Sequence, residues 1–352
     1  MSGLMEELNA RAIDLGVPLG VHLDLTYRCN ERCVHCYLDH DDLGEMTYEE
    51  IHRLLGQMAE AGVFILTLSG GEPLLRKDFF AILRRASVLG FNIKLKTNAL
   101  LIHEREAALI RELGVDSIQV SVYSHRPEVH DAITKVKGSL ERSLKAIRFM
   151  VSQELRVTLA TPLMRQNVAD YPRVQALARE LGAQFELDPT ITPHLNGDRS
   201  LLSLNVARED LARVLHDENV VGNVAEFCAP PAPADASVLD EVPCSAGHSY
   251  CYVSPYGEVY PCVQFPLPSG NVRHQDFIDI WKNSPQLNEV RTIRTRDLPI
   301  CSTCPNVGSC SRCPGLAYKE GNMRGPSAAD CEKSYLRSGV PSAAMMMRRA
   351  AS

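Results

Sequence analysis

Short apolar segments alternate with longer amphipathic stretches from residue 21 to about residue 193. In the longer stretches apolar residues recur at helical spacing, for example Ile51, Leu54, Leu55 and Met58. The shorter segments are predicted strands, and they begin near Val21, Val63, Phe91, Val115, Arg156 and Ala183. Strand–helix alternation at this spacing predicts right-handed crossovers and a parallel sheet.

Local signals mark the ends of the predicted helices. Thr47 and Glu50 form a capping box before the first helix, and Asp170 is expected to cap the fifth ahead of Pro172. Glycine stands where a left-handed residue ends a helix, at Gly62, Gly90, Gly114 and Gly182. These signals place the helix boundaries between the strands.

Several strands alternate apolar with polar residues. His22 and Asp24 interrupt the first strand, Lys94 and Lys96 the third, and Gln119 the fourth. Parallel strands that are buried on both faces are normally continuous apolar runs. We therefore expect one face of the sheet to pack against helices and the other to line a polar cavity, as in an incompletely closed barrel.

Composition narrows the class of protein. The chain has 352 residues, of which 45% are hydrophobic, and a net charge of -6 with both signs interspersed. Nothing in this balance favours a nucleic acid or a membrane as partner. The N-terminus has no export signal, so we expect a cytoplasmic protein. Twelve cysteines, several in CxxC spacing, then indicate metal ligands rather than disulfides.

Three cysteines follow the first strand in the spacing CxxxCxxC: Cys29, Cys33 and Cys36. Thiolates select iron–sulfur clusters or zinc, and three of them leave one iron of a four-iron cluster open. A structural zinc site with His35 as fourth ligand is the alternative. A second motif, Gly70–Pro73, follows the second strand. Both motifs lie at strand ends, where α/β enzymes place their active sites.

These two motifs resemble the signatures of the radical S-adenosylmethionine (SAM) enzymes. The resemblance implies a partial (β/α)6 barrel, a [4Fe-4S] cluster bound by the three cysteines, and SAM on the open iron. It also implies reductive cleavage of SAM to a 5′-deoxyadenosyl radical that abstracts hydrogen from a substrate. The SAM contacts implied by the resemblance are Tyr37, Gly70, Gly71, Glu72, Pro73, Asn98, Ser121 and Arg165.

Eight further cysteines lie between residues 244 and 331, and two of them flank a turn at Ser254–Gly257 that predicts a hairpin. Their layout resembles the SPASM extension of peptide-modifying radical SAM enzymes. It differs in one spacing, since two residues rather than three separate Cys310 from Cys313. One or two zinc ribbons are the alternative. The resemblance implies two auxiliary iron–sulfur clusters, one held by Cys244, Cys251, Cys262 and Cys313, the other by Cys301, Cys304, Cys310 and Cys331.

The chain therefore divides into five predicted parts. Residues 1–18 form an N-terminal extension, 19–195 the radical SAM core, 196–243 a bridging region, 244–337 the SPASM-like domain and 338–352 a disordered tail. The bridge contains a Pro/Ala-rich stretch over residues 230–234. Cys228, also in the bridge, is expected to be an inert, buried thiol.

The resemblance is greatest to the peptide maturases of pyrroloquinoline quinone and mycofactocin biosynthesis. It implies oxidative modification or crosslinking of a ribosomally synthesised precursor peptide. No room for a leader-binding domain precedes Cys29, so a separate leader-peptide-binding protein is expected, with flavodoxin or ferredoxin as reductant. Modification of a tetrapyrrole side chain and sulfatase maturation are the alternatives. A non-catalytic iron–sulfur or zinc protein would have no use for the Gly70–Pro73 motif.

Overall fold

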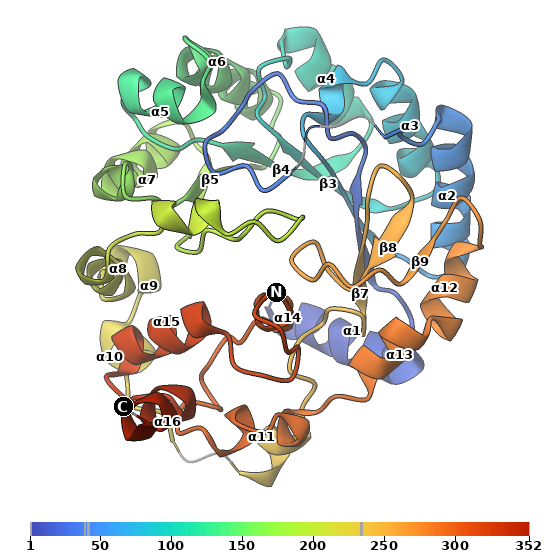
Figure 1. Ribbon diagram of the computed structural model, residues 1–352. Helices are drawn as coiled ribbons and strands as arrows, with labels where there is room; N and C mark the ends of the chain where they lie inside the picture. Colours follow the sequence, from blue (N-terminus) through green and yellow to red (C-terminus); the bar gives the residue numbers. More distant parts are fainter. Residues whose placement is uncertain (1, 39, 41–42, 233–234, 352) are drawn as a thin grey trace.

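The computed structural model describes residues 2–38, 40, 43–232 and 235–351. Its centre is a curved nine-stranded sheet in the order β6-β5-β4-β3-β2-β1-β7-β8-β9 (Figure 1). The six strands of the first part all run parallel, as the alternation predicts. They are β1 (Gly20–Asp24), β2 (Ile65–Ser69), β3 (Asn92–Thr97), β4 (Val115–Ser121), β5 (Val157–Pro162) and β6 (Gln184–Asp188).

Helices cover the outer face of this sheet (Figure 1). Val21, Leu23 and Leu25 of the first strand segment point toward them and are fully buried, in one core that continues through the strands and helices. The predicted partial barrel is confirmed. The covering helices are α2 (Tyr48–Glu60), α3 (Phe79–Val88), α4 (Glu104–Glu112), α5 (Pro127–Thr134), α6 (Ser139–Ser152) and α7 (Tyr171–Glu180), with 3-10 turns η1 (Pro73–Leu75) and η2 (Val168–Asp170).

Most of the predicted helix signals act as expected. The Thr47–Glu50 capping box is present at α2, and the four glycines after helices have positive φ. Asp170 occupies the N-cap position of α7, but its side chain does not cap the helix. Its carboxylate instead accepts hydrogen bonds from the Ser124 hydroxyl at 2.5 Å and from Arg126.

The cysteine-rich part joins the same sheet. Strand β7 (Tyr250–Val253) lies parallel beside β1, with Val21 opposite Cys251. The predicted hairpin is confirmed, since β7 pairs antiparallel with β8 (Glu258–Tyr260), which pairs with β9 (Gly270–Asn271). The polar face of β1 is therefore buried rather than wet, and His22 and Asp24 are only 4% and 1% exposed.

Short helices and loops form the remaining chain. The expected disordered tail is instead helical over the described residues of α16, because Ala343 and Ala344 are buried against the cysteine-rich part. Pro233 and Ala234 of the Pro/Ala-rich stretch lie outside the described residues. No helix in the described ranges is both long and apolar enough to cross a membrane. The elements are α1 (Ser2–Leu15), η3 (Ser200–Leu204), α8 (Arg208–Leu215), α9 (Glu218–Val221), α10 (Val224–Phe227), α11 (Ala236–Asp240), α12 (Phe277–Asn283), α13 (Pro285–Arg291), η4 (Thr295–Asp297), η5 (Cys301–Thr303), α14 (Pro314–Lys319), α15 (Ala328–Ser338) and α16 (Ala343–Ala351).

Candidate functional site

A cavity of about 250 Å³ opens at the carboxyl ends of the parallel strands. The loop that follows β1 carries the three cysteines into it, and β2, β3, β4, β5 and β6 each add residues at or just after their ends. The structure thus brings together two motifs and two single residues that are far apart in the sequence. The expected site residues that line it are Cys29, Cys33, Cys36, Tyr37, Gly70, Gly71, Asn98 and Ser121.

The thiols of this cysteine loop are held by neighbouring polar groups. Cys29 Sγ lies 3.4 Å from the Glu31 N–H and 3.7 Å from Asn98 Nδ2, and Cys33 Sγ is 3.7 Å from the Tyr123 hydroxyl. Burial raises the pKa of Cys29 to about 12, and the nearby carboxylates of Glu72 and Glu31 add to the effect. A thiolate here therefore needs a cationic group beside it, which suits an iron–sulfur cluster.

In the described part of the chain, no three His, Cys, Asp or Glu side chains converge tightly enough to hold a single metal ion. The fit of a cluster rests on the three thiols, their shared cavity and the open space beside Gly70 and Gly71.

Gly70 and Gly71 let two backbone segments touch. The Gly71 N–H donates to the Thr26 carbonyl at 2.7 Å. A Cβ on Gly70 would overlap the Thr26 carbonyl oxygen, and a Cβ on Gly71 would overlap the Arg28 carbonyl oxygen. Gly70 also has φ +136°, a region that side chains disfavour. Only glycine at both positions allows the Gly70–Pro73 turn to pack directly on the cysteine loop.

Glu72 and Pro73 do not line the cavity; they support it from behind. Glu72 is fully buried, and its carboxylate accepts from the N–H groups of Leu74 at 3.1 Å and Asn98 at 2.8 Å and from the Thr97 hydroxyl at 2.9 Å. Burial raises its pKa to about 7. Glu72 thus ties η1 to the end of β3, where Asn98 enters the cavity.

Arg165 is not a cavity residue, contrary to the expectation. It is exposed, and its Nε donates to the Asn205 carbonyl at 2.9 Å. The reason is local, because the chain after β5 buries Leu163 and Met164 and turns the next side chain outward.

Sequence reasoning assigned no role to several other residues of this region. Tyr123, Lys96 and Asp188 line the cavity, and Gln264 reaches it from the cysteine-rich part. The inward alternation of the strands signalled Lys96, but nothing in the sequence pattern signalled Gln264.

Four of the C-terminal cysteines surround a second cavity, of about 260 Å³. They come from η5, the loop after it and α15, and Arg312 and Asp330 lie among them. The thiol set in this cavity, which is the set expected for one auxiliary cluster, is Cys301, Cys304, Cys310 and Cys331.

Three cysteines of the other expected set lie near one another. Burial raises the pKa of Cys262 to about 11, and the neighbouring Cys244 and Cys313 thiols raise it further. Cys251 differs from the expectation, since the alternation of β7 turns it into the apolar core with Val21 and Val253, where it is fully buried. Cys262 is nevertheless near enough to add to the rise that burial causes in the pKa of Cys251.

Cys228 is partly buried at the end of α10, and its thiol donates to the Leu215 carbonyl at 3.4 Å. It belongs to neither cysteine set.

Comparisons with known proteins agree with this geometry. Residues 23–178 match the radical SAM superfamily, and residues 244–305 match the SPASM iron–sulfur cluster-binding domain. The chain is 29% identical over 320 residues to an AdoMet-dependent heme synthase of Methanosarcina barkeri, covering 84% of this chain and 90% of the relative. It is 26% identical over 308 residues to the mycofactocin maturase of Mycobacterium tuberculosis, covering 84% and 78%.

A third relative and a solved structure are also similar to the chain. The PqqA peptide cyclase of Bradyrhizobium diazoefficiens is 26% identical over 335 residues, covering 89% of this chain and 86% of the relative. The fold resembles the crystal structure of Streptococcus suis SuiB bound to its precursor peptide SuiA, with a TM-score of 0.72, 17% identity and coverage of 92% and 78%. The two family matches together span more than half of the chain and coincide with the two cysteine-bearing regions. The chain belongs to the radical SAM enzymes that carry a SPASM domain.

Proposed function

We propose that this enzyme oxidatively modifies or crosslinks a ribosomally synthesised peptide. The observation that carries the proposal is the position of Gln264, two residues after Cys262, in the same cavity as Cys29, Cys33 and Cys36. A substrate group in this cavity would lie between the SAM site and one auxiliary cysteine set. Relatives named as a mycofactocin maturase and a PqqA peptide cyclase support a peptide as the substrate.

The residues of the chain would bind and orient the reactants. When bound, SAM and the clusters would supply the hydrogen abstraction and the electron acceptor that a two-hydrogen oxidation needs. Gly70 and Gly71 leave room for the methionine part of SAM, and Asn98 fixes the cavity wall by donating to Asn30 at 2.6 Å. The inward residues of β3, β4 and β6 would contact the substrate.

The same proposal includes two partners. A separate leader-peptide-binding protein would hold the precursor near the enzyme and raise its effective concentration without any new contact at the reacting residue. A flavodoxin or ferredoxin would supply the electrons.

The test combines the reconstituted enzyme, SAM, a reductant, a precursor peptide encoded beside the enzyme and the leader-binding protein. Mass spectrometry of the peptide should show a loss of about two hydrogens, the mass change of a net two-electron oxidation. The loss should require SAM and should be faster with the leader-binding protein. An unchanged peptide in reactions that still form 5′-deoxyadenosine would contradict the peptide assignment.

A second candidate is modification of a carboxylate side chain on a tetrapyrrole. Relatives named AdoMet-dependent heme synthase match 84% of the chain at 29% and 28% identity. Lys96 lines the cavity without an ion-pair partner among the described residues, and a lysine there would attract a substrate carboxylate. A coproporphyrin-type substrate carrying propionate groups, incubated in the same assay, separates the two candidates by which of them changes mass.

A further inference from the structure

Residues 26–28, just before the first cysteine, contact both halves of the SAM site. The Thr26 carbonyl accepts the Gly71 N–H at 2.7 Å, and the Arg28 carbonyl accepts the Glu72 N–H at 2.9 Å. Cys29 follows directly in the chain. The position of this short segment therefore sets how the Gly70–Pro73 turn lies relative to the cysteine loop.

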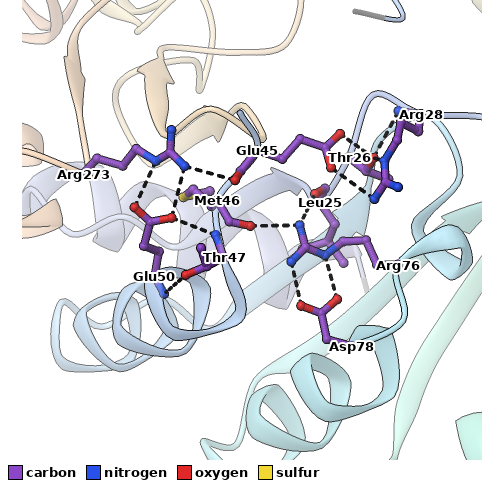
Figure 2. A network of polar contacts seen from close by, with 10 residues as sticks. All are labelled: Leu25, Thr26, Arg28, Glu45, Met46, Thr47, Glu50, Arg76, Asp78 and Arg273. Atoms are coloured by element: carbon purple, nitrogen blue, oxygen red, sulfur yellow. Dashed lines mark hydrogen bonds and ion pairs between the residues drawn. The ribbon is translucent and has the colours of Figure 1, made fainter. Parts of the chain in front are cut away.

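One carboxylate holds the segment in place, and Figure 2 shows its contacts with Thr26 and Arg28. Glu45 Oε1 accepts from the Thr26 hydroxyl at 2.5 Å and from the Tyr27 N–H at 3.0 Å. Its Oε2 pairs with Arg28 at 3.4 Å, and the Glu45 side chain is only 8% exposed. All three residues of the segment are thus joined to a single side chain that lies outside the cavity.

Glu45 is in turn fixed from the SPASM side. Arg273 donates to the Glu45 carbonyl at 3.0 Å and forms an ion pair with Glu50 at 3.1 Å (Figure 2). The neighbouring Met46 N–H donates to the Pro255 carbonyl at 2.7 Å. Arg273 and Pro255 both belong to the part of the chain that the SPASM model matches.

Arg76, from the turn after Gly70–Pro73, contacts the residues next to Thr26 and Glu45. Arg76 Nη1 donates to the carbonyls of Leu25 and Met46, at 3.0 Å each. Asp78 fixes the Arg76 guanidinium through two bonds of 2.9 and 2.7 Å. Residues 45–46 are therefore clamped between the turn after Gly70–Pro73 and the SPASM domain.

We propose that Glu45 is a positioning residue for the SAM site and that Arg273 couples it to the SPASM domain. Glu45 contacts no reacting group and acts only through Thr26, Tyr27 and Arg28. Without the Glu45 carboxylate, residues 26–28 are no longer held in place. The cysteine loop and the Gly70–Pro73 turn, which both contact these residues, then lose their fixed spacing. The affinity for SAM then falls while the chemistry of a bound SAM changes less.

The first readout uses the protein without cofactors. In Glu45→Ala, hydrogen exchange at the Tyr27 and Gly71 amides should speed up by about tenfold. The Tyr27 N–H loses its acceptor, and the Gly71 N–H donates to Thr26, which is no longer held by Glu45. Amides of β3 and β4 should exchange as in the parent. Glu49→Ala is the matched control, because Glu49 is an exposed carboxylate close by in the chain, in the first turn of α2.

The second readout is the SAM dependence of 5′-deoxyadenosine formation. Glu45→Ala should raise KM for SAM about tenfold, because the loss of its charge-assisted contacts weakens SAM binding. The fall in kcat should be smaller. Glu45→Gln should stay within about threefold, because an amide oxygen can still accept from Thr26 and Tyr27. Arg273→Ala should shift KM in the same direction, while Glu49→Ala should not.

Two results would overturn the proposal. One is a parent-like KM and parent-like exchange at Tyr27 and Gly71 in Glu45→Ala. The other is faster exchange spread over the whole core sheet, with KM and kcat damaged together, which is the pattern of simple destabilisation. If Glu45→Ala fails to fold, the other two variants test the proposal. A parent-like KM for SAM in Arg273→Ala, or a tenfold rise of that KM in Glu45→Gln, would refute it.

Discussion

Glu72 is a buried carboxyl directly behind the site. It is fully buried, yet three donors point at its oxygens. Glutamine at this position should lower the free energy of unfolding at pH 5, where the carboxyl of the folded protein is protonated, by about 1–3 kcal/mol, because the amide N–H2 would face donors. Chemical denaturation of the cofactor-free protein measures this, with Glu49→Gln as the exposed control.

The same residue gives a pH dependence with a definite sign. Its pKa in the folded protein, about 7, lies above the ordinary 4.5, so the folded state binds the proton more tightly. The stability that Glu72 contributes is therefore complete below pH 4.5 and declines as pH rises to 7, by up to about 3 kcal/mol. Glu72→Gln should lose this decline. An identical pH profile in parent and variant between pH 5 and 8 would contradict the assignment.

Single residues also show where sequence reasoning succeeds and fails. The three cysteines, Gly70 and Gly71 were predictable, because motif spacing reports directly on a local loop. Arg165 was expected in the site but lies exposed outside the cavity, since its direction depends on which of its neighbours the fold buries. Glu45 could not be predicted, because its partners Thr26, Tyr27 and Arg28 lie at the far end of the cysteine loop.

At the level of elements, the contact between β1 and β7 joins the two domains. It buries a chain of polar groups. Asp24 Oδ1 lies 3.0 Å from His22 Nε2, and Asp24 Oδ2 accepts from the Tyr252 hydroxyl at 2.8 Å. The hydroxyls of Tyr252 and Tyr27 are 2.6 Å apart. Tyr252→Phe should lower the free energy of unfolding by about 1.5–3 kcal/mol, since a charged acceptor loses its donor.

Tyr260→Phe is the matched control for that variant. Tyr260 stacks on Tyr252, but its hydroxyl makes no hydrogen bond among the described residues. Denaturation of the cofactor-free proteins should show a clear loss for Tyr252→Phe and little change for Tyr260→Phe. Equal losses would mean that packing, not the buried polar chain, holds β7 in place.

The sequence predicted the strands and the hairpin, but it did not predict which distant segments pack together. All six parallel strands and the hairpin after Cys251 were predicted from alternation and turn residues. The pairing of β7 with β1 was not, because a strand's partner is chosen by long-range packing that leaves no local pattern. The helical tail was missed for the same reason, since its order comes from burying Ala343 and Ala344.

For the whole molecule, the placement of Cys251 makes a prediction about metal content. Three separate thiol groups would bind about three four-iron clusters, on the order of 12 iron per chain. Cys251→Ala should leave this content nearly unchanged, because the thiol faces the apolar core. Cys304→Ala should lower it by about one cluster, since Cys304 lines the second cavity. Iron analysis after anaerobic reconstitution decides, and a large loss in Cys251→Ala would show that this thiol is a ligand.

For the whole molecule, we expect SAM to be cleaved at a site built from the cysteine loop, with the SPASM cysteines needed for a later step. Anaerobic chromatography of 5′-deoxyadenosine under a strong reductant tests this most directly. Replacing Cys29, Cys33 and Cys36 together with alanine should abolish its formation, because these thiols line the cavity with Gly70 and Gly71. Replacing Cys301, Cys304, Cys310 and Cys331 together should leave measurable cleavage while stopping substrate modification. Formation of 5′-deoxyadenosine at the parent rate by the Cys29/Cys33/Cys36 variant would show that SAM is cleaved elsewhere.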